Sequence, residues 1–388
     1  MPSSLVQFAP PCFTAAFLFA LSLADGGFFA WTWPWATLAL AAAAVGVSLI
    51  QGGVRAAPLD AAFVAGLVAV AGWQALSSEW SLDPGRSLQD AFRGTVYVAA
   101  AASFVVLARA AAPAGVLLGV VGGGAATLLY GILQRARSGT ADPLQQGLLF
   151  QPIGYANAVG IMAAVVALLA LGLLAESRSF AARAVLGGVV AVSSAALVLT
   201  NSRGAWLAGG AGLVTTGILR WPGRPRWAWV GWLVFVGLGI VSILVSPLLV
   251  APGRLASVMS DRPYYWSLAW HSLASPLHGL GSGAFAQLWA VDRPIPHYAI
   301  DAHSLYLEAL LELGAVGLLV VVATLAVPLV VAGRLIRGSS AAAAGAYTAF
   351  LVHAAVDWDW EMPVVTIVGL ASGVSVLAAA AAARGPRI

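Results

Sequence analysis

The stretch "DAHSLYLEALLELGAVGLL", residues 301–319, places an aspartate, a histidine and two glutamates at the front of a long apolar run. The run continues to residue 333, and a helix needs about 20 apolar residues to cross a bilayer. Ionisable side chains are costly inside a membrane and usually serve a function there. The stretch therefore predicts a membrane-spanning helix that begins near Ala302 and carries functional polar residues in its first turns.

The whole chain has the composition of a membrane protein. Of its 388 residues, 61% are hydrophobic and 9% are charged, and the mean hydropathy is +0.91, whereas soluble domains carry about 25% charged residues. The formal net charge of +4 comes without a basic run, so nucleic acid is not an expected partner. The single cysteine, Cys12, excludes an intrachain disulfide and a cysteine-based metal site. No arginine precedes Arg55, which argues against a cleaved signal peptide.

Twelve apolar segments predict an all-α polytopic membrane protein, with residues 1–388 as a single transmembrane domain. One connection, residues 249–303, is far longer than the others, and the chain shows no internal repeat. The predicted spans are 5–24, 33–50, 58–76, 90–109, 114–133, 153–175, 180–199, 204–219, 227–248, 304–333, 340–357 and 362–383.

The placement of arginine predicts the orientation in the membrane. With a cytoplasmic N-terminus, the inner loops hold eleven arginines and two acids, and the outer side holds eight arginines and thirteen acids. Cytoplasmic loops carry an excess of basic residues, so we expect both termini in the cytoplasm and the long loop outside. Arginines on the outer side oppose this bias and are candidates for another use, chiefly Arg203, Arg254, Arg262 and Arg293.

Arg203 lies in the sequence "TNSRGAW", residues 200–206, where Asn201 or Ser202 is a suitable N-cap for the span that follows. A helix N-terminus attracts anions through its free amides and its dipole. An arginine in that first turn would strengthen a phosphate or diphosphate site. An arginine that extends to the lipid headgroups explains the same position, and the spacing leaves both interpretations open.

Arg262 opens a second polar region, "SDRPYYWSLAWHSLASPLHGLGSGAFAQLW" at residues 260–289. Its tyrosines and tryptophans predict an amphipathic helix at the membrane interface, with Arg262 as another phosphate partner. The glycines of "GLGSG", residues 279–283, follow no predicted strand, so they indicate a flexible turn rather than a dinucleotide-binding fingerprint.

In the opening stretch, Asp301 is predicted to cap the helix and His303 to lie in its first turn. The helix dipole would favour a neutral imidazole there, which can accept a proton; an interfacial, hydrogen-bonded histidine is the alternative. Glu308 and Glu312 share one helix face. They would orient His303 or Arg203, or form a structural ion pair.

Two further groups of polar residues flank this stretch. The loop histidines His271, His278 and His297 lack any familiar metal-ligand spacing, so no metal site is predicted. The sequence "HAAVDWDWEMP", residues 353–363, places three acids between the last two spans. Of these, Asp359 and Glu361 are predicted to lie in a solvated turn, and Asp357 is the candidate for balancing an outer arginine.

The order "SRGAW", "PLHGLGSGAF" after an Arg-led aromatic helix, and "AHSLYLEALLELGAVGL" resembles the bacterial O-antigen ligase and polymerase superfamily. The early outer loop "SSEWSLDPGRSL", residues 77–88, is also similar to that family. The resemblance implies a GT-C-like membrane glycosyltransferase of the bacterial inner membrane, acting in lipopolysaccharide biosynthesis with a periplasmic active site. It implies glycan transfer from an undecaprenyl-diphosphate donor to a hydroxyl of the lipid A core, with no cofactor, no metal and inversion at the sugar.

By this resemblance, Arg203 and Arg262 would bind the donor diphosphate and His303 would be the essential histidine. Asp301, Glu308, Glu312, Asp357 and Arg293 are supporting candidates. The family often has asparagine after this histidine, where this chain has Ser304. A monomer is favoured.

Two other functions stay open at the level of sequence. An O-antigen or exopolysaccharide polymerase would join lipid-linked repeat units with the same residues. A lipid-linked sugar transporter would also need many spans and buried charges, but transporters more often show repeated halves and broken helices at the midplane.

Overall fold

The computed structural model describes residues 2–111, 113–138, 147–335 and 339–383, which are helical with no strand among them. Three of the helices are single 3-10 turns, η1, η2 and η3. The elements are α1 (Pro2–Leu23), η1 (Asp25–Gly27), α2 (Thr32–Gln51), α3 (Pro58–Leu76), η2 (Ser77–Glu79), α4 (Pro84–Ala111), α5 (Pro113–Ser138), α6 (Ala156–Glu176), α7 (Phe180–Thr200), α8 (Arg203–Arg220), α9 (Arg226–Leu249), α10 (Pro252–Met259), α11 (Arg262–His271), α12 (Ala284–Asp292), α13 (Leu305–Leu335), α14 (Ser339–His353), η3 (Asp359–Glu361) and α15 (Pro363–Ala382).

Each of the twelve predicted apolar segments contains one of these helices, which confirms an all-α multi-pass membrane protein. Within the described residues, nine helices are long and apolar enough to cross a membrane. The remaining three predicted segments form α1, α8 and α14, and the number of twelve spans stays a prediction.

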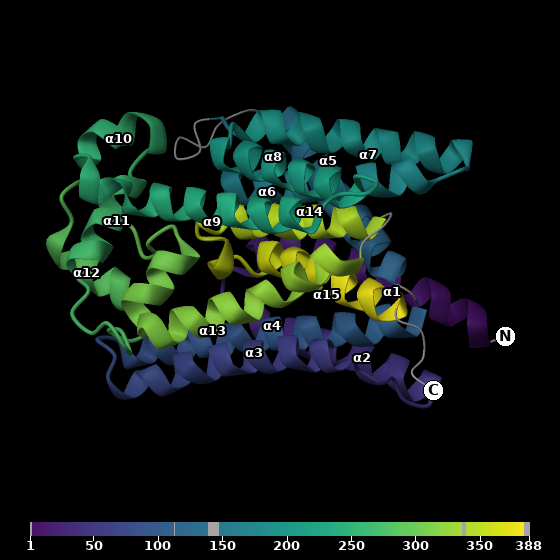
Figure 1. The fold of residues 1–388 in the computed structure, drawn as a ribbon, viewed down its shortest axis with the longest axis horizontal. Helices are drawn as coiled ribbons and strands as arrows, with labels where there is room; N and C mark the ends of the chain where they lie inside the picture. Colours follow the sequence, from purple (N-terminus) through teal and green to yellow (C-terminus); the bar gives the residue numbers. More distant parts are fainter. Residues whose placement is uncertain (1, 112, 139–146, 336–338, 384–388) are drawn as a thin grey trace.

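The C-terminal helix α15 lies at the centre of the bundle. Its residues are almost all buried, and it contacts α4, α14, α13 and α5. The helices α8 and α14, α1 and α5, and α6 and α7 pack closely in pairs, and α14, α5, α6 and α1 contact α15. Helix α9 has few buried residues. In Figure 1 the long helices run side by side, the short helices α10, α11 and α12 gather at one end, and α1 begins at the opposite end.

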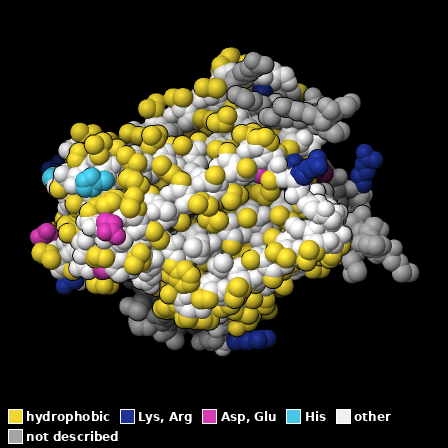
Figure 2. Space-filling view, turned by 90° about the horizontal axis from the view of Figure 1, so that it is seen from below, with side chains coloured by type: hydrophobic (Ala, Val, Ile, Leu, Met, Phe, Trp, Pro, Cys, Tyr) yellow, Lys and Arg dark blue, Asp and Glu magenta, His cyan; other side chains and the backbone are white. Residues whose placement is uncertain are grey.

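The outer surface of the bundle agrees with a membrane environment. On the face drawn in Figure 2, hydrophobic side chains cover the middle of the molecule, and the charged and histidine side chains lie mainly towards its two ends, with the histidines at one of them. Large side chains such as Leu38, Phe235 and Leu319 are more than 60% exposed. Contiguous exposed apolar surface of this kind suits lipid, because a soluble protein would hide it from water.

The long connection between α9 and α13 folds into α10, α11 and α12 and packs on the end of the bundle. The prediction that the aromatic residues of α11 lie at a membrane interface is wrong for two of them. Tyr265 and Trp266 are buried, in a second apolar core with Phe285 and Trp289 of α12. These rings therefore anchor the loop to the protein, because each ring finds more apolar contact there than at a headgroup layer.

The predicted flexible turn at residues 279–283 is instead closely packed. The amide of Gly281 donates to the carbonyl of Glu312, and a Cβ atom at Gly281 would lie 2.2 Å from that of Ser81. Gly314, with φ of 68°, breaks α13 at the same place, and a Cβ there would lie 2.3 Å from the carbonyl of Leu277. The single predicted span 304–333 is thus two helical pieces that meet at a kink, and the glycine turn fits against it.

Candidate functional site

The connection between α14 and α15, residues 354–362, joins the polar groups of α4, α6, α8, α11 and α13. The backbone carbonyl of Ala354 accepts from the amide of Leu305 at the start of α13. Asp357, Asp359 and Glu361 are all at most 5% exposed. The prediction of a solvated turn for Asp359 and Glu361 is therefore wrong, because each carboxylate has a buried basic partner. We call residues 353–361 the polar turn.

Arg262, the first residue of α11, is bound to this turn. Its Nη2 lies 2.6 Å from Oδ2 of Asp357, and its Nε donates to the carbonyl of Val356. Asp357 also accepts from the hydroxyl of Tyr155 at 2.9 Å and from the amide of Asn157 at 2.7 Å. Burial raises the pKa of Asp357, but the Arg262 guanidinium, the imidazoles of His353 and His303 and the amide of Trp358 together bring that pKa below its ordinary value. Asp357 therefore remains a carboxylate and fixes Arg262, as the sequence predicted for one outer arginine.

His303 lies between the rings of Tyr265 and Trp358, with centroid distances of 4.9 and 6.1 Å. Its Nδ1 is 3.0 Å from the carbonyl oxygen of Asp301. A carbonyl only accepts, so the hydrogen belongs to Nδ1 and the Nε2 lone pair is free. Burial lowers the pKa of His303 to about 4. The imidazole of His303 is therefore neutral and can accept a proton at Nε2.

The backbone around His303 differs from the prediction. Helix α13 begins at Leu305, so His303 precedes the helix and does not lie in its first turn. Its φ of 55° is in the left-handed region, which is uncommon for a residue other than glycine. The cap is Ser304, whose Oγ accepts from the amide of Leu307, and not Asp301. The serine found in place of the family's asparagine therefore caps the helix.

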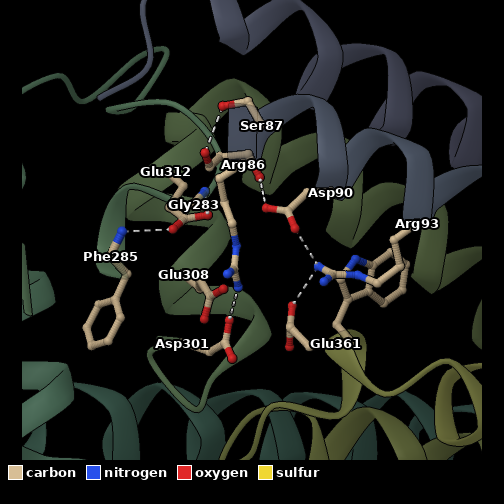
Figure 3. A network of polar contacts seen from close by, with 12 residues as sticks. Arg86, Ser87, Asp90, Arg93, Gly283, Phe285, Asp301, Glu308, Glu312 and Glu361 are labelled. Atoms are coloured by element: carbon tan, nitrogen blue, oxygen red, sulfur yellow. Dashed lines mark hydrogen bonds and ion pairs between the residues drawn. The ribbon is translucent and has the colours of Figure 1, made fainter. Parts of the chain in front are cut away.

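Asp301 belongs to a buried polar network instead, shown in Figure 3. One of its carboxylate oxygens lies 3.5 Å from Nη2 of Arg86, in α4. Burial raises the pKa of Asp301 to about 6. Arg86 comes from the early loop "SSEWSLDPGRSL", so the network joins that loop to the residues just before His303.

Among the described residues, Glu308 and Glu312 accept hydrogen bonds from backbone amides and not from side chains; the contact of Glu312 with Phe285 is drawn in Figure 3. Glu308 accepts from the amide of Ala302 at 2.7 Å, next to His303. Glu312 accepts from the amides of Gly283 and Phe285 at 2.8 and 2.9 Å, at the start of α12. Of the predicted roles, orientation of the His303 backbone fits Glu308, while Glu312 fixes the glycine turn; neither contacts Arg203.

Arg203 is the first residue of α8, and Ser202 caps that helix by accepting from the amide of Ala205. Its side chain is exposed and has no ion pair among the described residues. Gly204 packs on the polar turn, because a Cβ there would lie 3.5 Å from Val356. Arg203 therefore stands beside the turn that holds Arg262, with its charge free for an anion.

Two other predicted groups lie apart from this site. Arg293 is exposed at the end of α12, with no ion pair in the described part of the chain. His271, His278 and His297 do not come together as a metal-ligand group. Among described residues, the carboxylates of Asp301, Glu308 and Glu361 do lie within 4.8 Å of one another, and Arg86 and Arg93 each contact one of them.

Several residues of the site were missed by sequence reasoning. Arg86, Arg93, Tyr155, Asn157 and His353 all contact its acids. Arg93 bridges Asp90 and Glu361 at 3.1 and 3.4 Å (Figure 3). An arginine, an asparagine or a histidine inside an otherwise apolar helix was the available signal, because such residues are rare in a membrane unless they are paired.

Residues 188–322 match the family model described as O-antigen ligase. The match supports the O-antigen ligase superfamily for this segment of the chain. The match confirms the resemblance seen in the motifs and covers α8, α11 and the first part of α13, with Arg203, Arg262 and His303. No curated protein matches the chain significantly. The O-antigen ligase family is a group of glycosyltransferase-like ligases and polymerases, which implies lipid-linked glycans as partners.

Proposed function

We propose that this O-antigen ligase domain transfers glycan from an undecaprenyl-diphosphate donor to a hydroxyl of the lipid A core, at the periplasmic face of the inner membrane. Both termini then lie in the cytoplasm. The observation that carries the proposal is the position of His303, a neutral base with a free Nε2 within a cluster of tyrosine and tryptophan rings, next to the Arg262–Asp357 pair.

Glycosyl transfer needs a group that removes a proton and groups that stabilise the leaving anion. The acceptor oxygen attacks C1 of the donor sugar, and its proton passes to Nε2 of His303. The bond between C1 and the diphosphate oxygen breaks, and undecaprenyl diphosphate leaves with the electron pair. A direct attack of this kind inverts the anomeric centre. The donor is already activated, so no nucleotide is consumed.

The two arginines would serve the diphosphate differently. Arg203 has an uncompensated charge and lies at the N-terminus of α8. The guanidinium and the positive end of the helix dipole together attract an anion. Arg262 donates from Nε and Nη2 to the polar turn. The other N–H groups of this guanidinium are then available as fixed donors to the diphosphate. Fixed donors of this kind stabilise charge that develops on a leaving group.

An apolar cavity supports a lipid-linked donor. Its volume is about 460 Å³, and α9, α13 and α14 line it. Leu244, Trp270 and Tyr306 are among the lining residues, and Tyr306 is three residues from His303. A polyprenyl chain fits such a lining, because both are apolar and the lining offers van der Waals contact along the chain. We infer that the lipid tail occupies this cavity while the diphosphate reaches Arg203 and Arg262.

Filling the cavity tests this step. Ala326 lines it, whereas Ala323, on the same helix, is exposed and does not. We expect Ala326→Trp to raise the KM for an undecaprenyl donor by about tenfold, because the indole ring would occupy space that the tail needs. Ala323→Trp is the matched control and should leave that KM unchanged. Equal KM values in the two variants, measured with solubilised protein, would show that the tail binds elsewhere.

The dependence of the rate on pH tests the base. His303 must be neutral to accept a proton, and burial lowers its pKa to about 4, below the ordinary value of about 6.5. We therefore expect kcat to stay constant as the pH falls from 7 to about 5 and to drop as the pH approaches about 4. A loss of kcat centred on about pH 6.5 would mean that His303 is solvated in the complex or is not the base.

Two assays separate this function from its alternatives. In a deletion strain, complete loss of glycan-capped lipid A core indicates a ligase, whereas retention of a single capped repeat indicates a polymerase. Transfer by purified protein in reconstituted membranes, without an energy source, separates either enzyme from a transporter. We expect EDTA to leave the rate unchanged; a loss of rate that a divalent ion restores would contradict a metal-independent reaction and would direct attention to Asp301, Glu308 and Glu361.

A further inference from the structure

His353, the last residue of α14, is completely buried, but only one of its two ring nitrogens has a hydrogen-bond partner among the described residues. Its Nδ1 lies 2.6 Å from Oδ2 of Asp359. Its Nε2 is also buried and has no hydrogen-bond partner among the described residues. A buried polar atom without a partner costs free energy, so the position of Nε2 calls for a reason.

The free edge of this imidazole faces the N-terminus of α8. A Cβ atom at Gly204 would lie 3.2 Å from Nε2 and 3.3 Å from Cδ2 of His353. Gly204 is the second residue of that helix and follows Arg203. Glycine thus allows the ring to approach the helix backbone more closely than any other residue would.

The first turn of α8 also has backbone amides without a hydrogen-bond acceptor among the described residues. Ser202 accepts from the amide of Ala205, whereas the amides of Arg203 and Gly204 have no partner in the part of the chain that the structure describes. Free amides at the N-terminus of a helix bind anions. The buried Nε2 of His353 is an independent second sign of an anion at this turn, because a protonated Nε2 would donate into it.

We propose that His353 is a binding residue of the donor diphosphate site. Asp359 fixes the imidazole through Nδ1, and a hydrogen on Nε2 makes the first turn of α8 a four-part anion site. The parts are the Arg203 side chain, the amides of Arg203 and Gly204, and His353. The inference rests on the proposed function, since it names the diphosphate as the anion.

The charges of the pair fit this role. Asp359 accepts the Nδ1 hydrogen, so Nε2 either has a lone pair or carries a second hydrogen. The Asp359 carboxylate favours the second hydrogen, whereas the positive end of α8 and the Arg262 guanidinium oppose it as long as no anion is bound. A diphosphate at the turn favours it, and the resulting cation then stabilises the diphosphate in return. Binding and the hydrogen on Nε2 thus support each other, as reciprocal linkage requires.

The test compares two amides at position 353. Asparagine places its amide near Nδ1 and can still bind Asp359, but it has no atom at Nε2; glutamine places its amide near Nε2. We expect His353→Asn to raise the Kd for undecaprenyl diphosphate, and the KM for donor, by about tenfold, with a smaller change in kcat. His353→Gln should recover part of that loss. Binding is measured with the full chain in detergent micelles.

A second pair of variants avoids any change at His353. Gly204→Ala adds a methyl group 3.2 Å from Nε2, whereas a Cβ at Gly210, on the same helix, meets nothing within 4 Å. We expect Gly204→Ala to raise the Kd for undecaprenyl diphosphate and Gly210→Ala to leave it unchanged. Unchanged Kd values in His353→Asn and Gly204→Ala, with only thermal stability reduced, would show that the pair is purely structural and would overturn the inference.

The same measurements separate this inference from the proposed function. Binding of undecaprenyl diphosphate by the wild-type chain that Arg203→Ala weakens, but His353→Asn does not, would refute the role of His353 alone. Absence of binding by the wild-type chain would refute the proposed donor, and the role of His353 with it.

Discussion

Replacement of His303 by asparagine is expected to reduce kcat by about 10²–10⁴-fold, the usual contribution of a general base. Asparagine is the informative replacement because it tolerates the left-handed backbone that His303 adopts, with φ of 55°. The variant therefore removes the base and leaves the backbone before α13 in place. The KM for donor should change little, since Nε2 acts on the acceptor and not on the diphosphate.

His303→Ala serves as the comparison. Alanine is strained at a positive φ, so this variant should lose thermal stability as well as kcat. The measurement is transfer of glycan from an undecaprenyl-diphosphate donor by purified protein. Full activity in His303→Asn would refute a base at this position, and equal stability of the two variants would contradict the strained backbone.

Replacement of Arg262 by alanine is expected to lower the free energy of unfolding by about 3 kcal/mol, because it leaves the buried Asp357 carboxylate without its cation. Asp357 is 1% exposed, and Arg262 lies 2.6 Å from it. The same variant should also abolish measurable transfer, since an unpaired carboxylate would repel the donor diphosphate. Stability is followed by unfolding of the solubilised protein, and transfer is followed as above.

A double variant separates the two effects. Arg262→Ala with Asp357→Asn removes the unpaired charge, so stability should largely return while the donor diphosphate still lacks its Arg262 partner. Arg203→Ala is the matched arginine control: its side chain is exposed without an ion pair in the described residues, so it should weaken donor binding without loss of stability. Recovery of transfer in the double variant would show that Arg262 only neutralises Asp357.

The site divides into parts that sequence predicted and parts that it did not. The first turn of α8 was predicted with Arg203 and with Asn201 or Ser202 as its cap, because capping is a local property of four consecutive residues; the structure shows that the cap is Ser202. The ion pair of Asp301 was not predicted, because its partner Arg86 lies more than 200 positions away in the chain. Glu361 was predicted in a solvated turn for the same reason, because its partner Arg93 is also distant in the chain. Asp359 lies only six residues from its partner His353, but the sequence does not show that this turn folds into the interior.

The sequence by itself determined the all-helical membrane character, the position of the twelve apolar helices and the family motifs around Arg203, Arg262 and His303. These follow from hydrophobicity and from backbone hydrogen bonds within single segments, which bilayer insertion enforces. Only the tertiary structure decided where α13 begins and kinks, which residue caps it, and how the polar turn joins five helices. Those outcomes depend on pairs of buried charges and on close backbone approaches at Gly204, Gly281 and Gly314, and such contacts exist only once distant segments have packed together.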